Sequence, residues 1–125
     1  LKQPVFGVCL GLQLMCKRSE ENNTQCLGIF DLEVKRFEPK LKVPHMGWNN
    51  LEDCKGKLVK GLGKSPYVYF VHSYYAPLSD FTAATTDYVV PFSAALEKDN
   101  FYAVQFHPEK SSDAGIQILK NFIEL

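Results

Sequence analysis

The chain has 125 residues, of which 46% are hydrophobic and 22% are charged, so its composition is that of one globular domain rather than of a disordered segment. Its 14 basic side chains balance its 14 acidic ones, and this neutral charge argues against a nucleic-acid partner. No apolar run reaches the length of a membrane span, so a membrane partner is not expected either.

Residues 4–9 predict a buried strand, and residues 10–19 predict a helix that begins directly after it. The junction carries the run GVCLG at 7–11, in which a cysteine lies between two glycines. This is the layout of a nucleophile elbow, whose sharp turn leaves little room for flanking side chains. The turn would put the Cys9 sulfur at a helix N-terminus, where positive potential favours the thiolate. Cys9 is therefore predicted as a nucleophile; the alternative is a buried cysteine that acts only as a small hydrophobe.

The middle of the chain predicts mostly antiparallel strands. Residues 30–35 alternate between apolar and charged side chains, the period of a half-exposed strand. Residues 38–66 hold many prolines and glycines and predict mainly loop with short strands. Aromatic and β-branched residues predict further strands at 67–75, 82–88, 92–97 and 101–106, with a hairpin turn at 98–100.

The end of the chain predicts a helix that follows Ser111 and is capped by Ser112 or Asp113. One face of this helix is expected to pack on the core through its apolar side chains, which are Ile116, Leu119, Phe122 and Ile123. A strand–helix unit at each end, with antiparallel strands between them, predicts an α/β fold.

The run QFHPEK at 105–110 supplies candidate partners for a cysteine nucleophile, which needs a base and an orienting group. His107 can be the base, and Glu109 can accept a hydrogen bond from its other ring nitrogen and so fix the tautomer. Pro108 between them restricts the loop. In parallel α/β folds catalytic groups gather from the carboxyl ends of different strands, so the long separation from Cys9 is no obstacle. The alternative is a histidine that is simply satisfied in the core or at the surface.

GVCLGLQ at 7–13 followed by QFHPEKS at 105–111 resembles the class I, triad-type glutamine amidotransferases. The resemblance implies a three-layer, flavodoxin-like α/β domain that needs no metal and no cofactor. It implies that Cys9, His107 and Glu109 form the triad that cleaves the side-chain amide of glutamine. It also implies an oxyanion donor in the backbone N–H of Leu10. The implied substrate contacts come from Gly7, Gln13, Ser73 and Tyr74. The alternatives are a solvated helix residue for Gln13 and ordinary strand side chains for Ser73 and Tyr74.

Two middle segments, VPHMGWN at 43–49 and YFVHSYY at 69–75, are similar to segments of the glutaminase subunits of imidazole glycerol phosphate synthases, enzymes of histidine biosynthesis. This likeness implies a (βα)8-barrel synthase subunit that receives ammonia. An exposed Trp48 would suit such an interface, because aromatic side chains are favoured interface anchors; the alternative is a tryptophan folded on its own core. The implied interface residues are Pro44, Met46, Gly47, Trp48 and Asn49.

Two other functions stay open. One is a glutaminase of another synthase, of the anthranilate or aminodeoxychorismate type. The other is a catalytically silent binding or structural fragment. The resemblance implies that several strand and helix units, with a glycine-rich loop that supplies one oxyanion N–H, precede the strand at 4–9. On that expectation residues 1–125 form a partial domain without its N-terminal third. Such a chain would self-associate or be only marginally stable, and it would have negligible glutaminase activity even with the synthase partner present.

The four cysteines have neither metal-site nor redox-motif spacing. Because a catalytic thiolate also needs reducing conditions, a cytoplasmic location is expected. The remaining notable side chains are predicted to be inert, structural or, for the acidic pair, a solvated helix end: Cys16, Cys26, Cys54, His45, His72 and Glu20-Glu21.

Overall fold

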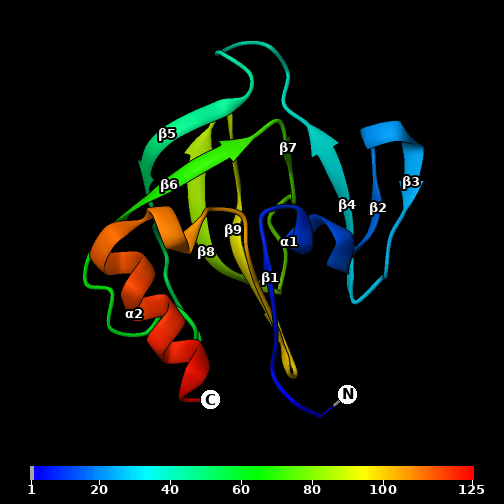
Figure 1. The fold of residues 1–125 in the computed structure, drawn as a ribbon. Helices are drawn as coiled ribbons and strands as arrows, with labels where there is room; N and C mark the ends of the chain where they lie inside the picture. The colour runs from blue at the N-terminus through cyan, green and yellow to red at the C-terminus, as the bar shows by residue number, and fades with distance from the viewer. Residues whose placement is uncertain (1) are drawn as a thin grey trace.

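A four-stranded sheet forms the centre of the structure, a computed structural model that describes residues 2–125 (Figure 1). β1 (Val5–Val8) pairs in parallel with β10 (Phe101–Val104). β9 (Val90–Lys98) runs antiparallel to β10 on one side and to β8 (Thr82–Tyr88) on the other. The first and last strands of the chain therefore lie side by side.

The other elements surround this sheet. A second sheet has the strand order β3 (Thr24–Gln25), β2 (Cys16–Ser19), β4 (Phe30–Arg36) and β7 (Tyr74–Tyr75). A two-stranded sheet joins β5 (His45–Asn50) to β6 (Tyr67–His72). The helices are α1 (Leu10–Met15), α2 (Ser112–Ile123) and the short 3-10 turns η1 (Glu21–Asn23) and η2 (Pro108–Lys110). No helix within residues 2–125 has the length and apolar character needed to cross a membrane.

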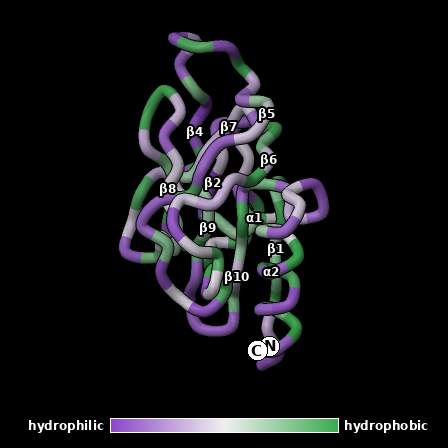
Figure 2. Tube along the Cα trace, turned by 90° about the vertical axis from the view of Figure 1, so that its left-hand side faces the viewer, coloured by the Kyte–Doolittle hydropathy of each residue, from purple (hydrophilic) through white to green (hydrophobic). Residues whose placement is uncertain are grey.

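Side chains alternate across the central sheet, so each of its faces has an apolar core. In β10, Tyr102 and Val104 belong to the core on the α2 side, whereas Ala103 belongs to the core on the α1 side. Phe122 of α2 stacks on Phe6 of β1 with 5.0 Å between ring centroids, and Figure 2 shows α2 beside β1. The expected α/β class is confirmed, with layers on both faces of the sheet.

The first helix is shorter than the sequence predicts. α1 ends at Met15, and residues 16–19 form β2, because β2 pairs with β3 and with β4. This pairing overrides the local helical pattern. The expectation of a helix end at Glu20-Glu21 is therefore wrong, although both side chains are exposed as expected. The Glu20 carboxylate accepts a hydrogen bond from the Arg36 N–H at 3.2 Å, and Glu21 begins η1.

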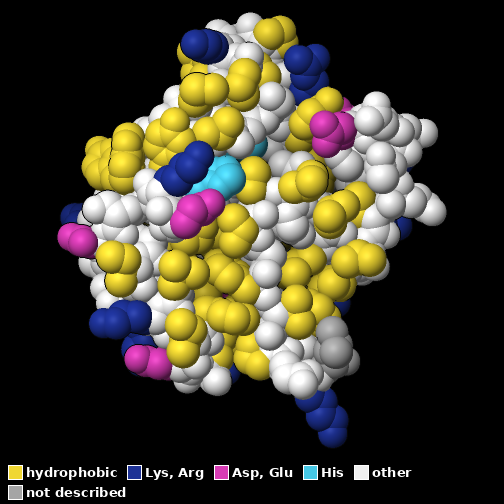
Figure 3. All heavy atoms as spheres, viewed as in Figure 1, with side chains coloured by type: hydrophobic (Ala, Val, Ile, Leu, Met, Phe, Trp, Pro, Cys, Tyr) yellow, Lys and Arg dark blue, Asp and Glu magenta, His cyan; other side chains and the backbone are white. Residues whose placement is uncertain are grey.

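The segment at 44–49, expected to be loop, is mostly the strand β5, which pairs with β6 along its whole length. Met46 and Trp48 alternate outward and are 57% and 53% exposed, whereas His45 between Pro44 and Met46 is buried. The expected exposure of Trp48 is confirmed, and the alternative of a tryptophan folded on its own core is wrong. In Figure 3, which has the same view as Figure 1, hydrophobic side chains gather at the upper left, over β5 and β6.

The helix α2 is rotated relative to the sequence prediction. Of the predicted apolar face only Phe122 is partly buried; Ile116, Leu119 and Ile123 are exposed. The buried positions are instead Gly115 and Ile118. A Cβ on Gly115 would lie 1.8 Å from the Pro108 carbonyl oxygen, so this glycine lets the helix backbone approach η2. That close contact fixes which face of the helix turns inward.

We expect Gly115→Ala to lower the free energy of unfolding by about 2–3 kcal/mol, because the added methyl group meets backbone that must shift. Gly11→Ala in α1 is the matched control, since a Cβ there meets no described atom within 4 Å. The control should leave stability unchanged or raise it by up to about 1 kcal/mol through helix propensity. Urea denaturation followed by circular dichroism measures both. Equal stability of the two variants would show that the Pro108 contact does not position α2.

Candidate active site

Cys9 lies at the turn between β1 and α1, as the predicted elbow requires. Its backbone has φ 54° and ψ −105°, a conformation that non-glycine residues rarely adopt. The Cys9 N–H donates to the Val104 carbonyl at 2.8 Å, which extends the β1–β10 pairing to the turn. The sulfur is thus held at the carboxyl edge of two parallel strands.

Of the two glycines that flank Cys9, only Gly7 is required by close packing. A Cβ on Gly7 would lie 3.0 Å from the backbone of Gly11 and 3.0 Å from the Met15 side chain, so Gly7 permits the close approach of α1 to β1. Gly11 faces open space, and nothing in the described residues requires a glycine there. Gly7 is buried within β1; its predicted contact with glutamine stays a prediction.

Five of the predicted site residues line one shallow hollow of about 220 Å³. These are Cys9, Leu10, Gln13, Ser73 and Tyr74, and the hollow is completed by Glu21, Val71 and His72. An adjoining hollow of about 190 Å³ shares Leu10, Gln13 and Glu21 with it. A larger hollow, of about 480 Å³, lies elsewhere, beside Trp48 and the start of α2. Of these three hollows only the one of about 220 Å³ contains the strained cysteine, so it is the candidate active site.

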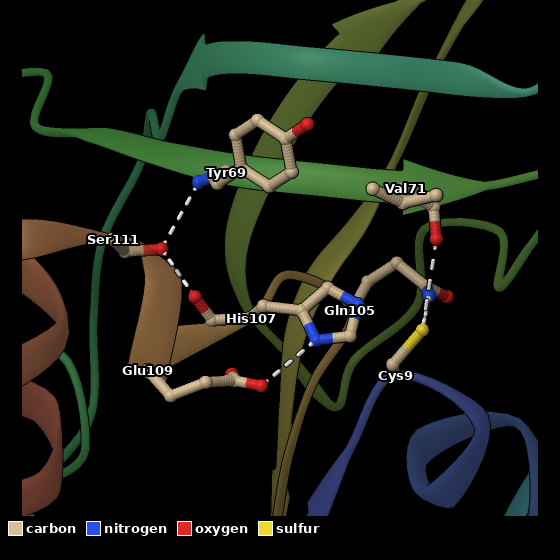
Figure 4. A network of polar contacts seen from close by, with 7 residues as sticks. All are labelled: Cys9, Tyr69, Val71, Gln105, His107, Glu109 and Ser111. Carbon is tan, nitrogen blue, oxygen red and sulfur yellow. Dashed lines mark hydrogen bonds and ion pairs between the residues drawn. The ribbon is translucent and has the colours of Figure 1, made fainter.

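The Cys9 sulfur is partly buried and has two polar neighbours (Figure 4). The thiol donates to the Val71 carbonyl at 3.7 Å, and the Gln105 side-chain amide donates to the sulfur at 3.6 Å. Burial raises the pKa of the Cys9 thiol, and the negative charge of Glu109 adds to the rise, while hydrogen bonds from the Leu10 N–H and Gln105 oppose it. The expected preference for the thiolate is therefore wrong for the resting site, because desolvation and the Glu109 charge outweigh the two donors.

Burial also raises the pKa of two other thiols, those of Cys54 and Cys16, and it raises that of Cys16 to about 12. Cys16 is fully buried. Their surroundings agree with the predicted inertness of these two side chains, because the thiolate is the reactive form.

His107 and Glu109 meet as the sequence predicts. His107 Nδ1 lies 3.1 Å from Glu109 Oε2, at the start of η2. The Ser111 hydroxyl donates to the His107 carbonyl at 2.6 Å and accepts from the Tyr69 N–H at 3.0 Å (Figure 4). Ser111 is the N-cap of α2, but its hydroxyl serves this bridge and caps no helical N–H, so the predicted caps Ser112 and Asp113 are wrong. No hydrogen bond joins the His107 ring to Cys9 within residues 2–125.

A chain of hydrogen bonds leads from β5 to the hollow. His72 Nδ1 donates to the Tyr74 carbonyl at 2.8 Å, so its Nε2 is the acceptor for His45 Nδ1 at 3.0 Å. The Asn49 amide then donates to His45 Nε2 at 3.4 Å. Gln13 Nε2 also donates to the Tyr74 carbonyl, at 3.2 Å. Both histidines are buried and hydrogen-bonded, in agreement with the structural role predicted for them.

Burial lowers the pKa of His45 to about 4 and that of His72 to about 3. Both rings are neutral in the folded chain at pH 5–6.5, whereas in the unfolded chain they take up protons below about pH 6.5. We therefore expect the free energy of unfolding to be greatest above pH 6.5 and to fall by up to about 1.4 kcal/mol per pH unit for each ring as the pH drops toward 5.

The measurement is urea denaturation between pH 8 and pH 5 of the unchanged chain and of His72→Gln. Because the variant takes up one proton fewer on unfolding, its free energy of unfolding should fall about half as steeply with pH. Ring proton resonances of His45 and His72 should stay constant over the same range. A ring that titrates near pH 6.5 in the folded chain would contradict the assigned neutral pair.

Three residues at the site were not predicted as functional. Gln105 is fully buried between Cys9 and Gln13, Val71 offers its carbonyl to the thiol, and Ser111 fixes the His107 backbone. Only Gln105 carried a signal in the sequence, as a polar side chain at the end of an otherwise apolar strand. The other two act through contacts between distant segments, which no local pattern reveals.

The strained cysteine at a strand–helix turn, together with the histidine–carboxylate pair after the neighbouring parallel strand, defines a cysteine-centred site on an α/β fold. The sequence model of the class-I glutamine amidotransferases matches residues 1–125, and the chain belongs to that family.

The chain is similar to individual members of this family. The chain is 65% identical to the imidazole glycerol phosphate synthase subunit HisH of Bacteroides fragilis, over all of this chain and 65% of that protein. It is 51% identical to the protein of the same name from Escherichia coli K12, over 98% of this chain and 64% of that protein. A glutamine amidotransferase from Thermotoga maritima has the same fold, with a TM-score of 0.64 and 20% identity over 97% of this chain and 45% of that one. The chain thus spans a little under two thirds of the length of these two curated relatives.

Proposed function

We propose that this chain is the catalytic part of the glutaminase subunit of an imidazole glycerol phosphate synthase, which hydrolyses glutamine to glutamate and ammonia. Membership of the class-I family supports the reaction. The high identity to proteins named as HisH subunits supports the synthase over one of the anthranilate or aminodeoxychorismate type. The observation that carries the proposal is the hollow that joins Cys9 to Gln13, Ser73 and Tyr74.

The proposed reaction is an acyl transfer. The Cys9 sulfur gives up its proton to His107 and attacks the side-chain carbonyl carbon of glutamine, and the Leu10 N–H donates to the developing oxyanion. The C–N bond then breaks as His107 returns the proton to the departing ammonia. His107 next activates a water molecule, which releases glutamate from the thioester. Glu109 holds the His107 ring in one tautomer, supported by the 3.1 Å hydrogen bond between them.

The proposed partner is a (βα)8-barrel synthase subunit that takes up the ammonia, and the proposed location is the cytoplasm. The outward side chains of β5 suit the interface, since Met46 and Trp48 are more than half exposed. Pro44, Gly47 and Asn49 complete the proposed surface. Aromatic and Met side chains are enriched at such interfaces, while scattered exposed apolar residues alone would not require one.

A diazo-ketone analogue of glutamine tests the proposed reaction without requiring turnover. We expect it to label Cys9 and spare Cys26, and we expect excess glutamine to slow the labelling. His107→Ala should slow labelling by about 10²-fold or more, because general acid–base groups contribute on that scale. Glu109→Gln should slow it less, since its role is orientation. Mass spectrometry of the modified peptides locates and times the label.

Iodoacetamide, which has no glutamine-like groups, is the control reagent, and glutamine should not protect against it. Label on Cys16, Cys26 or Cys54 in place of Cys9 would contradict the assignment. Labelling of His107→Ala at the unchanged rate would contradict the role given to the histidine.

The proposal extends to self-association of the chain. β1 pairs with β10 along one edge, and within residues 2–125 no strand pairs with its other edge. α2, next to it, exposes Ile116, Leu119 and Ile123. An open strand edge beside apolar side chains favours pairing with a second copy.

We expect light scattering to find dimers or larger species of the isolated chain. Replacing both Ile116 and Ile123 by Lys should shift the population toward the monomer, because charge on this helix face opposes burial. The matched control is Leu41→Lys, which adds a charge at an exposed leucine in the loop before β5. A chain that stays monomeric up to its solubility limit would contradict this part of the proposal.

A further inference from the structure

Gln105 is a fully buried polar side chain whose amide contacts the sulfur of the proposed nucleophile. It follows β10 directly, and its backbone N–H donates to the Ala94 carbonyl at 2.8 Å, so the main chain is fixed by the central sheet. Its side chain is 0% exposed. A buried amide must find partners for its carbonyl oxygen and its amino group, because an unsatisfied polar group in the core is costly.

The neighbours of Gln105 determine which end of its amide faces the sulfur. Gln13 Nε2 donates to the Tyr74 carbonyl, which can only accept, so the amino end of the Gln13 amide is the end that lies in this region. The same Nε2 lies 3.1 Å from Gln105 Oε1, where it donates its other proton. Gln105 must therefore turn its own amino group the other way. That group lies 3.6 Å from Cys9 Sγ (Figure 4).

The sulfur is thus placed between an acceptor and a donor. In the thiol form its proton points to the Val71 carbonyl. Once the proton leaves, the sulfur carries negative charge and gains most from the Gln105 N–H, since hydrogen bonds to charged groups are roughly twice as strong as neutral ones. The neighbouring Leu10 N–H also lowers the pKa of the thiol. During attack on a substrate carbonyl, however, Leu10 is assigned to the oxyanion, which leaves Gln105 as the side-chain donor.

We propose that Gln105 is a further catalytic residue of this site: its side-chain N–H donates to the Cys9 thiolate and stabilises the nucleophilic form, with Gln13 as its positioning residue. The inference rests on the proposed function only in taking Cys9 as the nucleophile. It assigns Gln13 a role beyond the predicted contact with glutamine, because the amino group of Gln13 is occupied by Tyr74 and Gln105 in the resting site.

The test is the pH dependence of Cys9 alkylation by iodoacetamide, located by mass spectrometry in the folded chain. Gln105→Met keeps the length of the side chain but removes the donor. We expect it to raise the pKa of the Cys9 thiol by about one unit, so that alkylation below that pKa slows about 10-fold. Gln105→Glu keeps the shape and replaces the amino group by oxygen, so it should raise the pKa at least as far. Gln13→Met should raise it by less, because Gln105 loses its orientation but not its donor.

Gln25→Met, in the exposed strand β3, is the matched control and should leave the alkylation profile unchanged. Circular dichroism confirms folding of each variant, and Gln105→Glu and Gln13→Met keep the test decisive if Gln105→Met unfolds. An unshifted thiol pKa in the folded Gln105 variants would overturn the inference. Because iodoacetamide needs no glutamine site, a shifted pKa together with failed diazo-ketone labelling would refute the proposed function and leave the role of Gln105 intact.

Discussion

The parallel pairing of β1 with β10 is the constraint on which the site depends. Both strands end at the same edge of the sheet, and the hydrogen bond from Cys9 to Val104 extends the pairing into the turn. The chain can then leave β1 only through a sharp bend, which puts Cys9 at a positive φ and requires the close approach that Gly7 allows. Two motifs from opposite ends of the sequence meet because these two strands are neighbours.

The polar groups behind the hollow are connected rather than separately solvated. The Tyr74 carbonyl accepts from Gln13 on one side and from His72 on the other. These donors lead through Gln105 to the sulfur and through His45 to β5. Among the described residues that are not exposed, no buried side-chain nitrogen or oxygen lacks a hydrogen-bond partner. A fully satisfied network of this kind specifies one arrangement of the core, because each member fixes the orientation of the next.

The sequence predicted what depends on local patterns and missed what depends on packing. The elbow at Cys9, the alternating strand β4 and the pair His107–Glu109 followed from residue types and spacing. The prediction that the first helix continues over residues 16–19 was wrong, because this segment pairs with β3 and β4 as a strand. The prediction of which face of α2 turns inward was also wrong. That face is set by a backbone contact at Gly115, which the apolar periodicity of the sequence does not encode. Gln105 was missed because its partners are far away in the chain.

The contact between Gly115 and Pro108 has a mechanical consequence. The Ser111 hydroxyl holds the His107 carbonyl, and the Gly115 N–H donates to the Ser111 carbonyl at 3.2 Å, so the segment from His107 to Gly115 moves with the first turn of α2. On its other side, the His107 N–H donates to the Tyr69 carbonyl at 2.9 Å, so the same segment is also attached to β6. The imidazole and its carboxylate are therefore braced from two directions, by α2 and by β6. Any displacement of the imidazole relative to the Cys9 sulfur has to disturb one of these two attachments.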